Sequence, residues 1–382
     1  MGFEIFENHW EITGILNMET PLRIGTSLAL YSTSSAPVLL QYDGKNEKYE
    51  PFIPGSSLKG VLRATAERIL NTHGHSKAIV DTIFGSQNGG AKIKVRDSHI
   101  DHTITMDHTT EQRPHAGKNT RFRTEEVIPP IRFRIQIDVD NANDVEISLI
   151  LKCLDEFNHK RAHIGGGVSR GYGFVSISEL KVIKKTPTNL DHGEEKNAEE
   201  LKSVLKLSSH GSPVIKDTFD YYYAAHTYNL EGCIVCEFQV VCETKFKMPG
   251  VEEPTVTMLG QPVIPGSTIK GWLREKFFRS NLNRDRVFGS AQKNGARSRV
   301  LISDAFSDKK FTTNDHLPAG EILKCWVVFD NLKQNEISQI LNVMKNGDCI
   351  TGRRTARQTG NRVRFELVKA WKYTLTDPVY VI

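Results

Sequence analysis

The sequence predicts an α+β protein that consists of two tandem, ferredoxin-like domains. A motif that occurs twice predicts the duplication, and the same order of strands and helices around each copy predicts the fold class. Residues 53–60 read Ile-Pro-Gly-Ser-Ser-Leu-Lys-Gly, and residues 264–271 read Ile-Pro-Gly-Ser-Thr-Ile-Lys-Gly. Repeat periods of about 20–50 residues are typical of solenoids, so this much wider spacing indicates two whole domains.

Three further segments recur in the same order, which supports a tandem duplication. Phe-Gly-Ser at 84–86 returns at 288–290, and Val-Arg-Asp-Ser at 95–98 returns as Ile-Ser-Asp-Ala at 302–305. A glycine loop at 164–173 returns at 350–360, where arginines replace some of its glycines. We expect a first domain at residues 1–183, a linker at 184–219 and a second domain at 220–382.

The first elements follow from local patterns. A strand is expected at 10–18, followed by a loop rich in Ser and Thr at 27–35. The repeated motif indicates a tight turn that leads into a helix over 58–70, because apolar residues recur there at helical spacing. Ser56 or Ser57 is the expected N-cap of that helix.

The remaining elements complete a sheet with helices on one face. Polar residues dominate 99–123, and a strand with alternating side chains is expected at 131–139, followed by a helix at 145–157, the glycine loop and a strand at 173–177. This is the order of a ferredoxin-like fold with a long insertion. The polar linker holds one short helix at 198–207. The second domain repeats the plan from a strand at 233–242 to one at 362–368, with a shorter insertion.

Bulk composition indicates a soluble globular chain with local basic patches. The 382 residues carry a net charge of +5, with 38% hydrophobic and 25% charged residues. The sequence has no apolar run of about 20 residues and no signal-peptide core, which predicts a cytoplasmic protein. Cys233 and Cys236 lie three apart in a strand, so we expect half-buried residues on opposite faces rather than metal ligands.

The start of each repeated helix is a candidate phosphate site. The first amides of a helix are unpaired donors, and the helix dipole favours an anion there. Lys59 and Lys270 add positive charge, and Arg63 and Arg274 follow four residues later on the same face. The spacing differs from that of a nucleotide-binding P-loop, so ATP is not the expected ligand. The alternative is an ordinary capped helix with solvated basic residues.

The glycine loops indicate contact with nucleic-acid phosphates. A strand rather than a helix follows the first loop, which argues against a dinucleotide fingerprint. Arginines enter the second loop, and further basic residues cluster at 113–123, as a phosphate-binding surface requires. The glycines of the first loop are expected to let one backbone approach another closely, and the alternative to phosphate contact is a glycine-rich turn that packs against a helix.

Histidines and aspartates between 97 and 115 raise the question of a metal site, because both residue types bind zinc or manganese. The segment has no regular ligand spacing. We therefore favour a polar arm that touches a ligand and predict no metal site.

The helix start at 53–60, Phe-Gly-Ser at 84–86, Arg-Asp-Ser at 96–98 and the loop ending Arg-Gly-Tyr-Gly at 170–173 resemble the RAMP superfamily. More narrowly, the chain resembles the backbone (Cas7-type) subunits of type III CRISPR effector complexes, and its two domains are similar to the fused subunits of type III-D systems. The resemblance implies RNA-recognition-like cores with thumb insertions, here at 102–129 and, much shorter, at 311–318. It also implies that the chain binds guide RNA (crRNA) and complementary target RNA beside other effector subunits, in antiviral defence and away from membranes.

The RNA contacts expected from this resemblance and from the basic patches are, in the first half, Ser56, Ser57, Lys59, Arg63, Arg121, Arg123, Gly165, Gly166, Gly167, Ser169 and Arg170 and, in the second, Ser267, Lys270, Arg274, Arg353, Arg354 and Arg357.

Catalytic members of the family cut target RNA with an aspartate just before a proline, in the loop that precedes the repeated motif. Ser35 stands there in the first half and Glu252 in the second. A serine does not replace a carboxylate as a base, so the first site is expected to be silent. Cleavage would use Glu252, or Asp43 after a loop rearrangement, with a divalent cation (Mg or Mn). Guide binding alone needs no cofactor.

Three functions stay open at this point. The leading one is an RNA-binding backbone subunit that spans two successive positions, and the alternative is a metal-dependent target-RNA endoribonuclease. A third class, a soluble enzyme that acts on a small phosphorylated ligand, would need a closed pocket. The polar arm and the basic runs favour an open groove instead.

Overall fold

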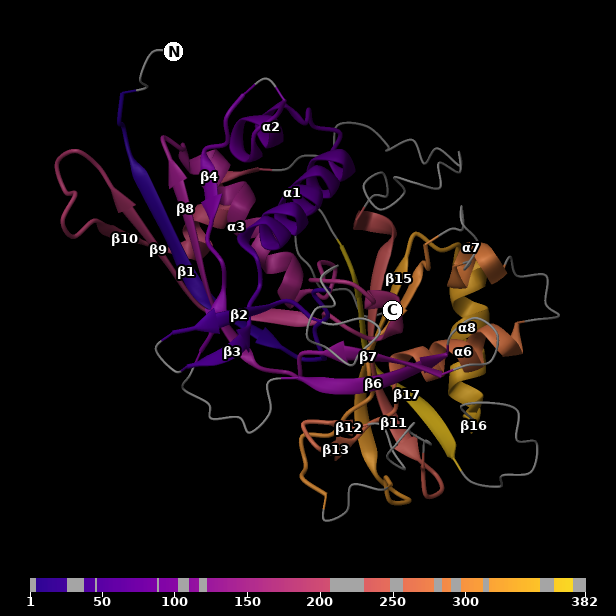
Figure 1. The fold of residues 1–382 in the computed structure, drawn as a ribbon. Helices are drawn as coiled ribbons and strands as arrows, with labels where there is room; N and C mark the ends of the chain where they lie inside the picture. Colours follow the sequence, from indigo (N-terminus) through magenta and orange to yellow (C-terminus); the bar gives the residue numbers. More distant parts are fainter. Residues whose placement is uncertain are drawn as a thin grey trace.

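The computed structural model describes residues 5–25, 38–44, 47–87, 89–101, 110–116, 122–206, 230–247, 257–277, 284–289, 297–311, 316–350 and 361–373. Two halves lie side by side, each with one main antiparallel sheet and its helices (Figure 1). No helix of the described part has the length and apolar character needed to cross a bilayer.

The first half contains β1 (His9–Met18), β2 (Leu40–Asp43), β3 (Lys48–Pro51), α1 (Gly55–Thr72), α2 (Ala78–Phe84), β4 (Ile93–Val95), β5 (His99–Ile100), β6 (Glu111–Ala116), β7 (Phe122–Val127), β8 (Arg132–Asp140), α3 (Asp144–Asn158), η2 (Val168–Arg170), β9 (Val175–Lys185), β10 (Glu194–Lys196) and α4 (Ala198–Val204). The second half contains η3 (Leu230–Gly232), β11 (Cys233–Cys242), β12 (Thr257–Met258), β13 (Gln261–Pro262), α6 (Gly266–Lys276), α7 (Arg284–Phe288), β14 (Val300–Ile302), β15 (Ile322–Asp330), α8 (Gln334–Asn346), β16 (Asp348–Cys349) and β17 (Arg362–Lys372).

The two sheets have the same topology. The strand order β9-β1-β8-β4 of the first sheet corresponds to β17-β11-β15-β14 of the second. Even an irregularity is shared, because the register of the central strand shifts at Thr13/Ile15 in one sheet and at Glu237/Phe238 in the other. The predicted α+β class, built twice on a ferredoxin-like plan, is confirmed.

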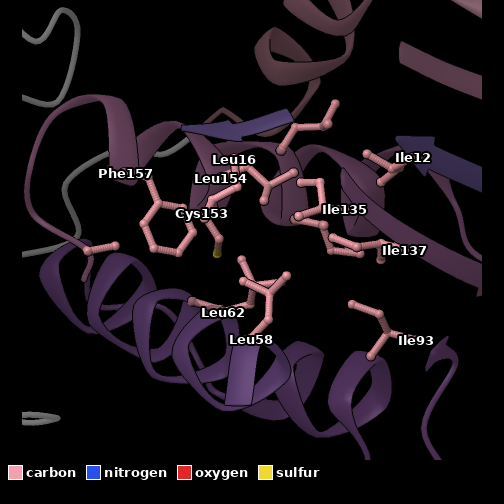
Figure 2. Close-up of a cluster of buried hydrophobic side chains, with 14 of the residues drawn as sticks. Ile12, Leu16, Leu58, Leu62, Ile93, Ile135, Ile137, Cys153, Leu154 and Phe157 are labelled. Atoms are coloured by element: carbon pink, nitrogen blue, oxygen red, sulfur yellow. The ribbon is translucent and has the colours of Figure 1, made fainter. Parts of the chain in front are cut away.

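Strand alternation separates a core face from an open face in the first sheet. Phe133, Ile135 and Ile137 of β8 belong to the buried cluster beneath α1 and α3, whereas Arg134 and Gln136 are not part of it. Leu58 and Leu62 of α1 meet Leu154 and Phe157 of α3 over these strands (Figure 2). Each fully buried aliphatic side chain contributes about 1.5–3 kcal/mol, so this layer holds the helix starts in place.

The first fold continues beyond the boundary expected at residue 183, which falls inside β9. β10 pairs with β9, and α4 packs on α3 through Ser148, whose hydroxyl donates to Lys202 O and accepts from Leu205 N. Residues 184–205, predicted to be linker, are therefore part of the first half. Residues 207–229 lie outside the described part.

The long insertion of the first half forms a hairpin. β6 and β7 pair antiparallel from Glu111↔Val127 to Ala116↔Phe122, within the predicted thumb at 102–129. The hairpin extends from the first half across to the second (Figure 1). The corresponding segment of the second half, residues 303–321, is shorter than residues 96–131 of the first.

The two strand cysteines of the second half lie on opposite faces, as predicted, but both are fully buried rather than half-buried. Cys236 belongs to the core beneath α6 and α8, and Cys233 belongs to a separate apolar cluster on the other face of the sheet. Burial raises the pKa of both thiols to about 12. Both therefore act as small apolar residues.

Candidate functional site

Each repeated helix starts at the glycine of the motif, and the preceding proline is its N-cap without a side-chain hydrogen bond. The predicted serine cap is therefore wrong. A carboxylate takes its place, because Gly55 N donates to Asp97 Oδ1 at 2.7 Å and Gly266 N donates to Asp304 Oδ1 at 2.9 Å. The helix dipole stabilises these carboxylates, so each first-turn amide holds an anion from its own half. Phosphate contact at this point stays a prediction.

The motif glycines are required by backbone packing. A Cβ on Gly55 would lie 2.0 Å from Val95 O, and one on Gly266 would lie 2.1 Å from Ile302 O. Both oxygens belong to the backbone of an edge strand, β4 or β14, and cannot move aside. The close approach lets the aspartate that follows each strand reach the helix start.

The predicted cations near the helix starts have protein partners. Arg63 pairs with Asp81 at 2.6 Å, and Arg274 pairs with Asp285 at 2.9 Å. In both halves the aspartate belongs to the next short helix, α2 or α7. Such exposed pairs contribute at most about 1 kcal/mol, so a phosphate can compete for either arginine. Lys59 Nζ lies 3.4 Å from Ile93 O.

The predicted contact residues Ser56, Ser57 and Ser267 all lie in the first turn of their helix. Ser56 is exposed, and Ser57 and Ser267 are partly buried.

The first glycine loop lies on the second half of the chain. A Cβ on Gly171 would come within 2.5 Å of Asp304 Oδ1 and 3.3 Å of Gly266 Cα. Val168 joins an apolar cluster with residues of β11, β14 and β15. Gly165 approaches the backbone of Arg23 in the same manner. The predicted close approach of one backbone to another is confirmed for this loop, and the loop packs against the start of α6, as the alternative interpretation expected. Gly165 and Gly166 are exposed, and Gly167 is partly buried.

Three predicted cations from both halves gather at this junction. Lys270 Nζ of α6 donates to Ser169 O of the loop at 3.3 Å. Burial, followed by the charges of Arg274 and Arg170, lowers the pKa of Lys270 to about 8. Glu125 partly compensates Arg170 at 3.2 Å. A mutually repelling, partly exposed group of cations is a place where a phosphate is favourable.

The hairpin fixes the junction by a buried ion pair that the sequence did not reveal. Arg113 of β6 is 2% exposed and donates from Nη1 to Asp304 Oδ2 at 2.7 Å; Asp304 is fully buried. Burial disfavours the arginine charge, but the carboxylate outweighs this and raises the pKa of Arg113. The only sequence signals were the basic cluster around Arg113 and the repeat that contains Asp304, and neither indicates that the two meet.

Several predicted residues cannot be placed. Arg121, Glu252, Arg353, Arg354, Arg357 and Ser35 lie outside the described part. Arg123 is described only as a backbone position in β7, paired with His115. Asp43 ends β2 in the small β2–β3 hairpin, opposite Lys48. Within the described part, no three His, Cys, Asp or Glu residues gather as metal ligands would.

Comparison with known proteins identifies the family. Over 232 residues, the chain is 25% identical to the CRISPR system Cms endoribonuclease Csm3 of Methanocaldococcus jannaschii. The aligned region covers 52% of this chain and 91% of that relative. The RAMP superfamily matches at residues 15–176 and 250–375, one region in each half. The duplicated fold and both matched regions agree that the chain belongs to the RAMP superfamily.

Proposed function

We propose that the chain is a backbone subunit of a type III CRISPR effector complex, in which its two halves hold successive stretches of guide RNA beside other effector subunits. The RAMP matches and the similarity to Csm3 support the complex. The observation that carries RNA binding is the cation group of Arg170, Lys270 and Arg274, which both halves build together.

Two further glycines support an outside ligand near the helix starts. Gly60 and Gly271 lie inside α1 and α6, and a Cβ on either would meet nothing within 4 Å. Glycine inside a helix costs about 1 kcal/mol relative to alanine, and no packing of the described residues requires it here. Both positions leave room for a phosphate backbone to approach the helix surface.

Replacing Lys270 by glutamine tests this function. Glutamine can still donate to Ser169 O but lacks the charge, so guide RNA should bind about ten-fold more weakly, with a salt slope reduced by about one. Wild-type affinity should be highest below pH 8 and fall as pH rises through it, because Lys270 loses its proton there. The variant should lose this pH dependence. Filter binding of one guide RNA at several salt concentrations and pH values gives all three results.

Lys309→Gln is the matched control, because Lys309 is an exposed lysine of the same half that lies 3.7 Å from Glu321. It should leave affinity and salt slope unchanged. Equal effects of both substitutions would show that overall charge, and not the junction, binds RNA.

Target-RNA cleavage is a second candidate, favoured by the similarity to Csm3, which is named as an endoribonuclease. If the complex cleaves complementary RNA at this chain, we expect the reaction to need Mg or Mn. The cleavage rate should fall at least about 100-fold in Glu252→Ala, which is the effect of losing a general base. Gel analysis of labelled target RNA, with and without a chelator, measures this. Undiminished cutting in the double variant E252A/D43A would rule out both assigned carboxylates.

A further inference from the structure

The surface of the second half that forms the junction between the halves has an equivalent on the first half. In the second half, the sheet face opposite the helices and the start of α6 contact the first half. This receiving face consists of Cys233, Val235, Leu301, Trp326, Val328 and Asp304, all at most 6% exposed. The first half covers it with Val168 and Phe174 of its loop region and with Arg113 of its hairpin.

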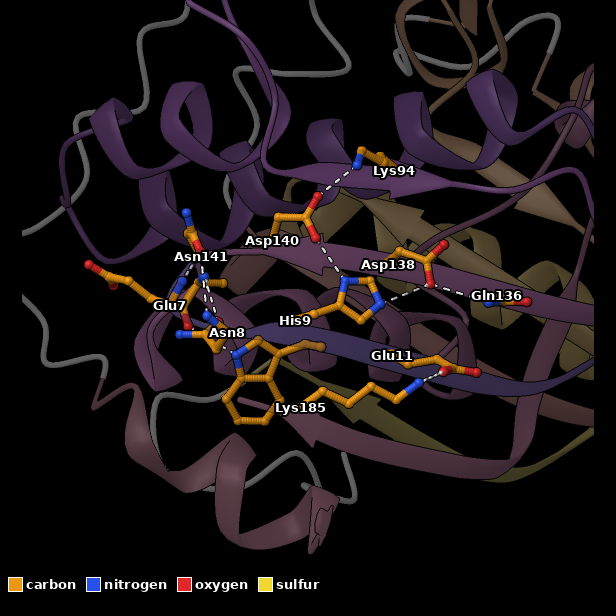
Figure 3. A network of polar contacts seen from close by, with 12 residues as sticks. Glu7, Asn8, His9, Glu11, Lys94, Gln136, Asp138, Asp140, Asn141 and Lys185 are labelled. Atoms are coloured by element: carbon orange, nitrogen blue, oxygen red, sulfur yellow. Dashed lines mark hydrogen bonds and ion pairs between the residues drawn. The ribbon is translucent and has the colours of Figure 1, made fainter. Parts of the chain in front are cut away.

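Strand register identifies the equivalent positions of the first half. His9 pairs with Asp140 as Cys233 pairs with Asp330, and Ile93 pairs with Val139 as Val300 pairs with Phe329. The first receiving face is therefore His9, Glu11, Lys94, Gln136, Asp138 and Asp97. Most of these residues lie along the open face of the sheet in Figure 3.

The two receiving faces differ in chemistry. Five apolar positions of the second half are charged or polar in the first: Lys94 replaces Leu301, for example, and Asp138 replaces Val328. Much of the first face is also open, with the Lys94 side chain 69% exposed and a hollow of about 850 Å³ beside Asp97, although Asp138 is buried. A face that is permanently covered within one chain can be apolar. A face that is exposed to water until a separate partner binds is expected to be polar, like the rest of a protein surface.

Charge on the first receiving face argues for a protein partner rather than RNA. Its cations are neutralised locally: Lys94 pairs with Asp140 at 2.6 Å, and His9 lies 2.7 Å from the same carboxylate. Arg96 pairs with Asp138 at 2.7 Å. The carboxylates of Glu11, Asp97, Asp138 and Asp140 also outnumber Lys94 and Arg96 here, so this face lacks the excess of positive charge on which RNA binding depends.

Asp97 marks the point at which the partner would be fixed. Its Oδ1 accepts from Gly55 N, as Asp304 Oδ1 accepts from Gly266 N. Asp304 Oδ2 then binds Arg113 and is buried, whereas Asp97 is exposed and has no cation paired with it among the described residues. We propose that Asp97 is the docking residue for an arginine of a separate RAMP-fold subunit, whose hairpin and glycine loop cover the first receiving face. This proposal rests on the proposed function, because it requires a complex with further subunits.

The length of the insertion distinguishes between two possible partners, a different subunit and a second copy of this chain. In the internal junction, the arginine comes from the long insertion at 96–131. The second half, which a copy would present at the same place, has only the short insertion at 303–321. A second copy thus lacks the hairpin that carries the arginine, so the partner is a different RAMP-fold chain with a long insertion.

The test uses the host complex purified through a tag on the full chain, in wild-type, Asp97→Asn and Asp308→Asn forms. Asparagine can still accept from Gly55 N, so the helix start is preserved while the charge is lost. Asp308 is an exposed carboxylate of the second half and supplies the matched control. Native mass spectrometry counts RAMP subunits and guide RNA per complex, and melting temperatures verify that the variants fold. Light scattering on the isolated wild-type chain measures self-association.

We expect Asp97→Asn to lower retention of one neighbouring RAMP subunit about ten-fold or more, Asp308→Asn to retain it, and the isolated chain to stay monomeric. An intact complex that keeps this neighbour in Asp97→Asn overturns the inference alone. Loss of RNA with the neighbour retained also overturns it, since the face would then bind RNA, and concentration-dependent polymers of the isolated chain overturn the choice of partner. A wild-type chain purified with neither RNA nor a second RAMP subunit refutes the proposed function as well.

Discussion

Replacing Arg113 by methionine should destabilise the protein by about 3–5 kcal/mol, because it leaves the fully buried Asp304 carboxylate without its counter-ion. Among the described residues, the Asp304 carboxylate would keep only its bond from Gly266 N. Adding Asp304→Asn should restore a large part of the loss, since a neutral amide can accept the same bond without the cost of a buried charge. Urea unfolding of wild type, R113M and R113M/D304N measures both effects.

Arg134→Met is the control for this substitution. Arg134 is 68% exposed and pairs with Asp101 at 2.9 Å. Asp101 is buried but keeps Arg132 at 3.6 Å as a second counter-ion, so the loss of Arg134 should cost only about 1 kcal/mol. If R113M costs no more than R134M, the Arg113–Asp304 pair does not hold the two halves together.

Alanine should have opposite effects at the two glycines of the repeated motif. At Gly266 a Cβ would lie 2.1 Å from Ile302 O and 2.8 Å from Ser303 O, and neither backbone oxygen can move freely. Gly266→Ala should therefore destabilise the second half by about 3 kcal/mol or more. At Gly271 nothing lies within 4 Å of the added atom, so Gly271→Ala should stabilise α6 by up to about 1 kcal/mol. Thermal and urea unfolding of both variants measure the difference.

The first half supplies an independent repetition of this experiment. Gly55 would place a Cβ 2.0 Å from Val95 O, and Gly60 has nothing within 4 Å. Gly55→Ala should be destabilising and Gly60→Ala neutral or stabilising. A neutral Gly266→Ala together with a neutral Gly55→Ala would contradict the packing argument. Reduced RNA binding in the more stable Gly60→Ala or Gly271→Ala would support the close approach of a phosphate backbone.

Prediction from the sequence succeeded where the signal is local. The strand expected at 10–18 is β1 (His9–Met18), and the helix expected at 145–157 is α3 (Asp144–Asn158). Side-chain alternation and helical spacing repeat within a few residues, so neighbouring positions suffice to identify them. The helix expected at 58–70 begins earlier, at Gly55, because an aspartate more than forty residues away caps it.

The candidate site was predicted as a set of residues but not as an arrangement. Lys59 and Lys270 have equivalent sequence positions, yet among the described residues Lys270 meets the glycine loop of the other half, whereas Lys59 lies beside Ile93 O of its own half. Nothing in either motif states which loop lies on which helix start. That choice depends on how two whole sheets dock, through Val168 on one side and Trp326 on the other.

The sequence by itself determined that this protein is one fold built twice, with its order of strands and helices and its RAMP motifs. Short-range periodicity and the direct repetition of motifs predict these features. Only the tertiary structure decided that Asp97 and Asp304 cap the helices, that Arg113 is buried against Asp304, and that Arg170 and Lys270 converge. The physical reason is that these contacts join segments that are far apart in the sequence. Their packing and the burial of charge depend on how the two halves dock, and no periodic pattern in the sequence indicates this.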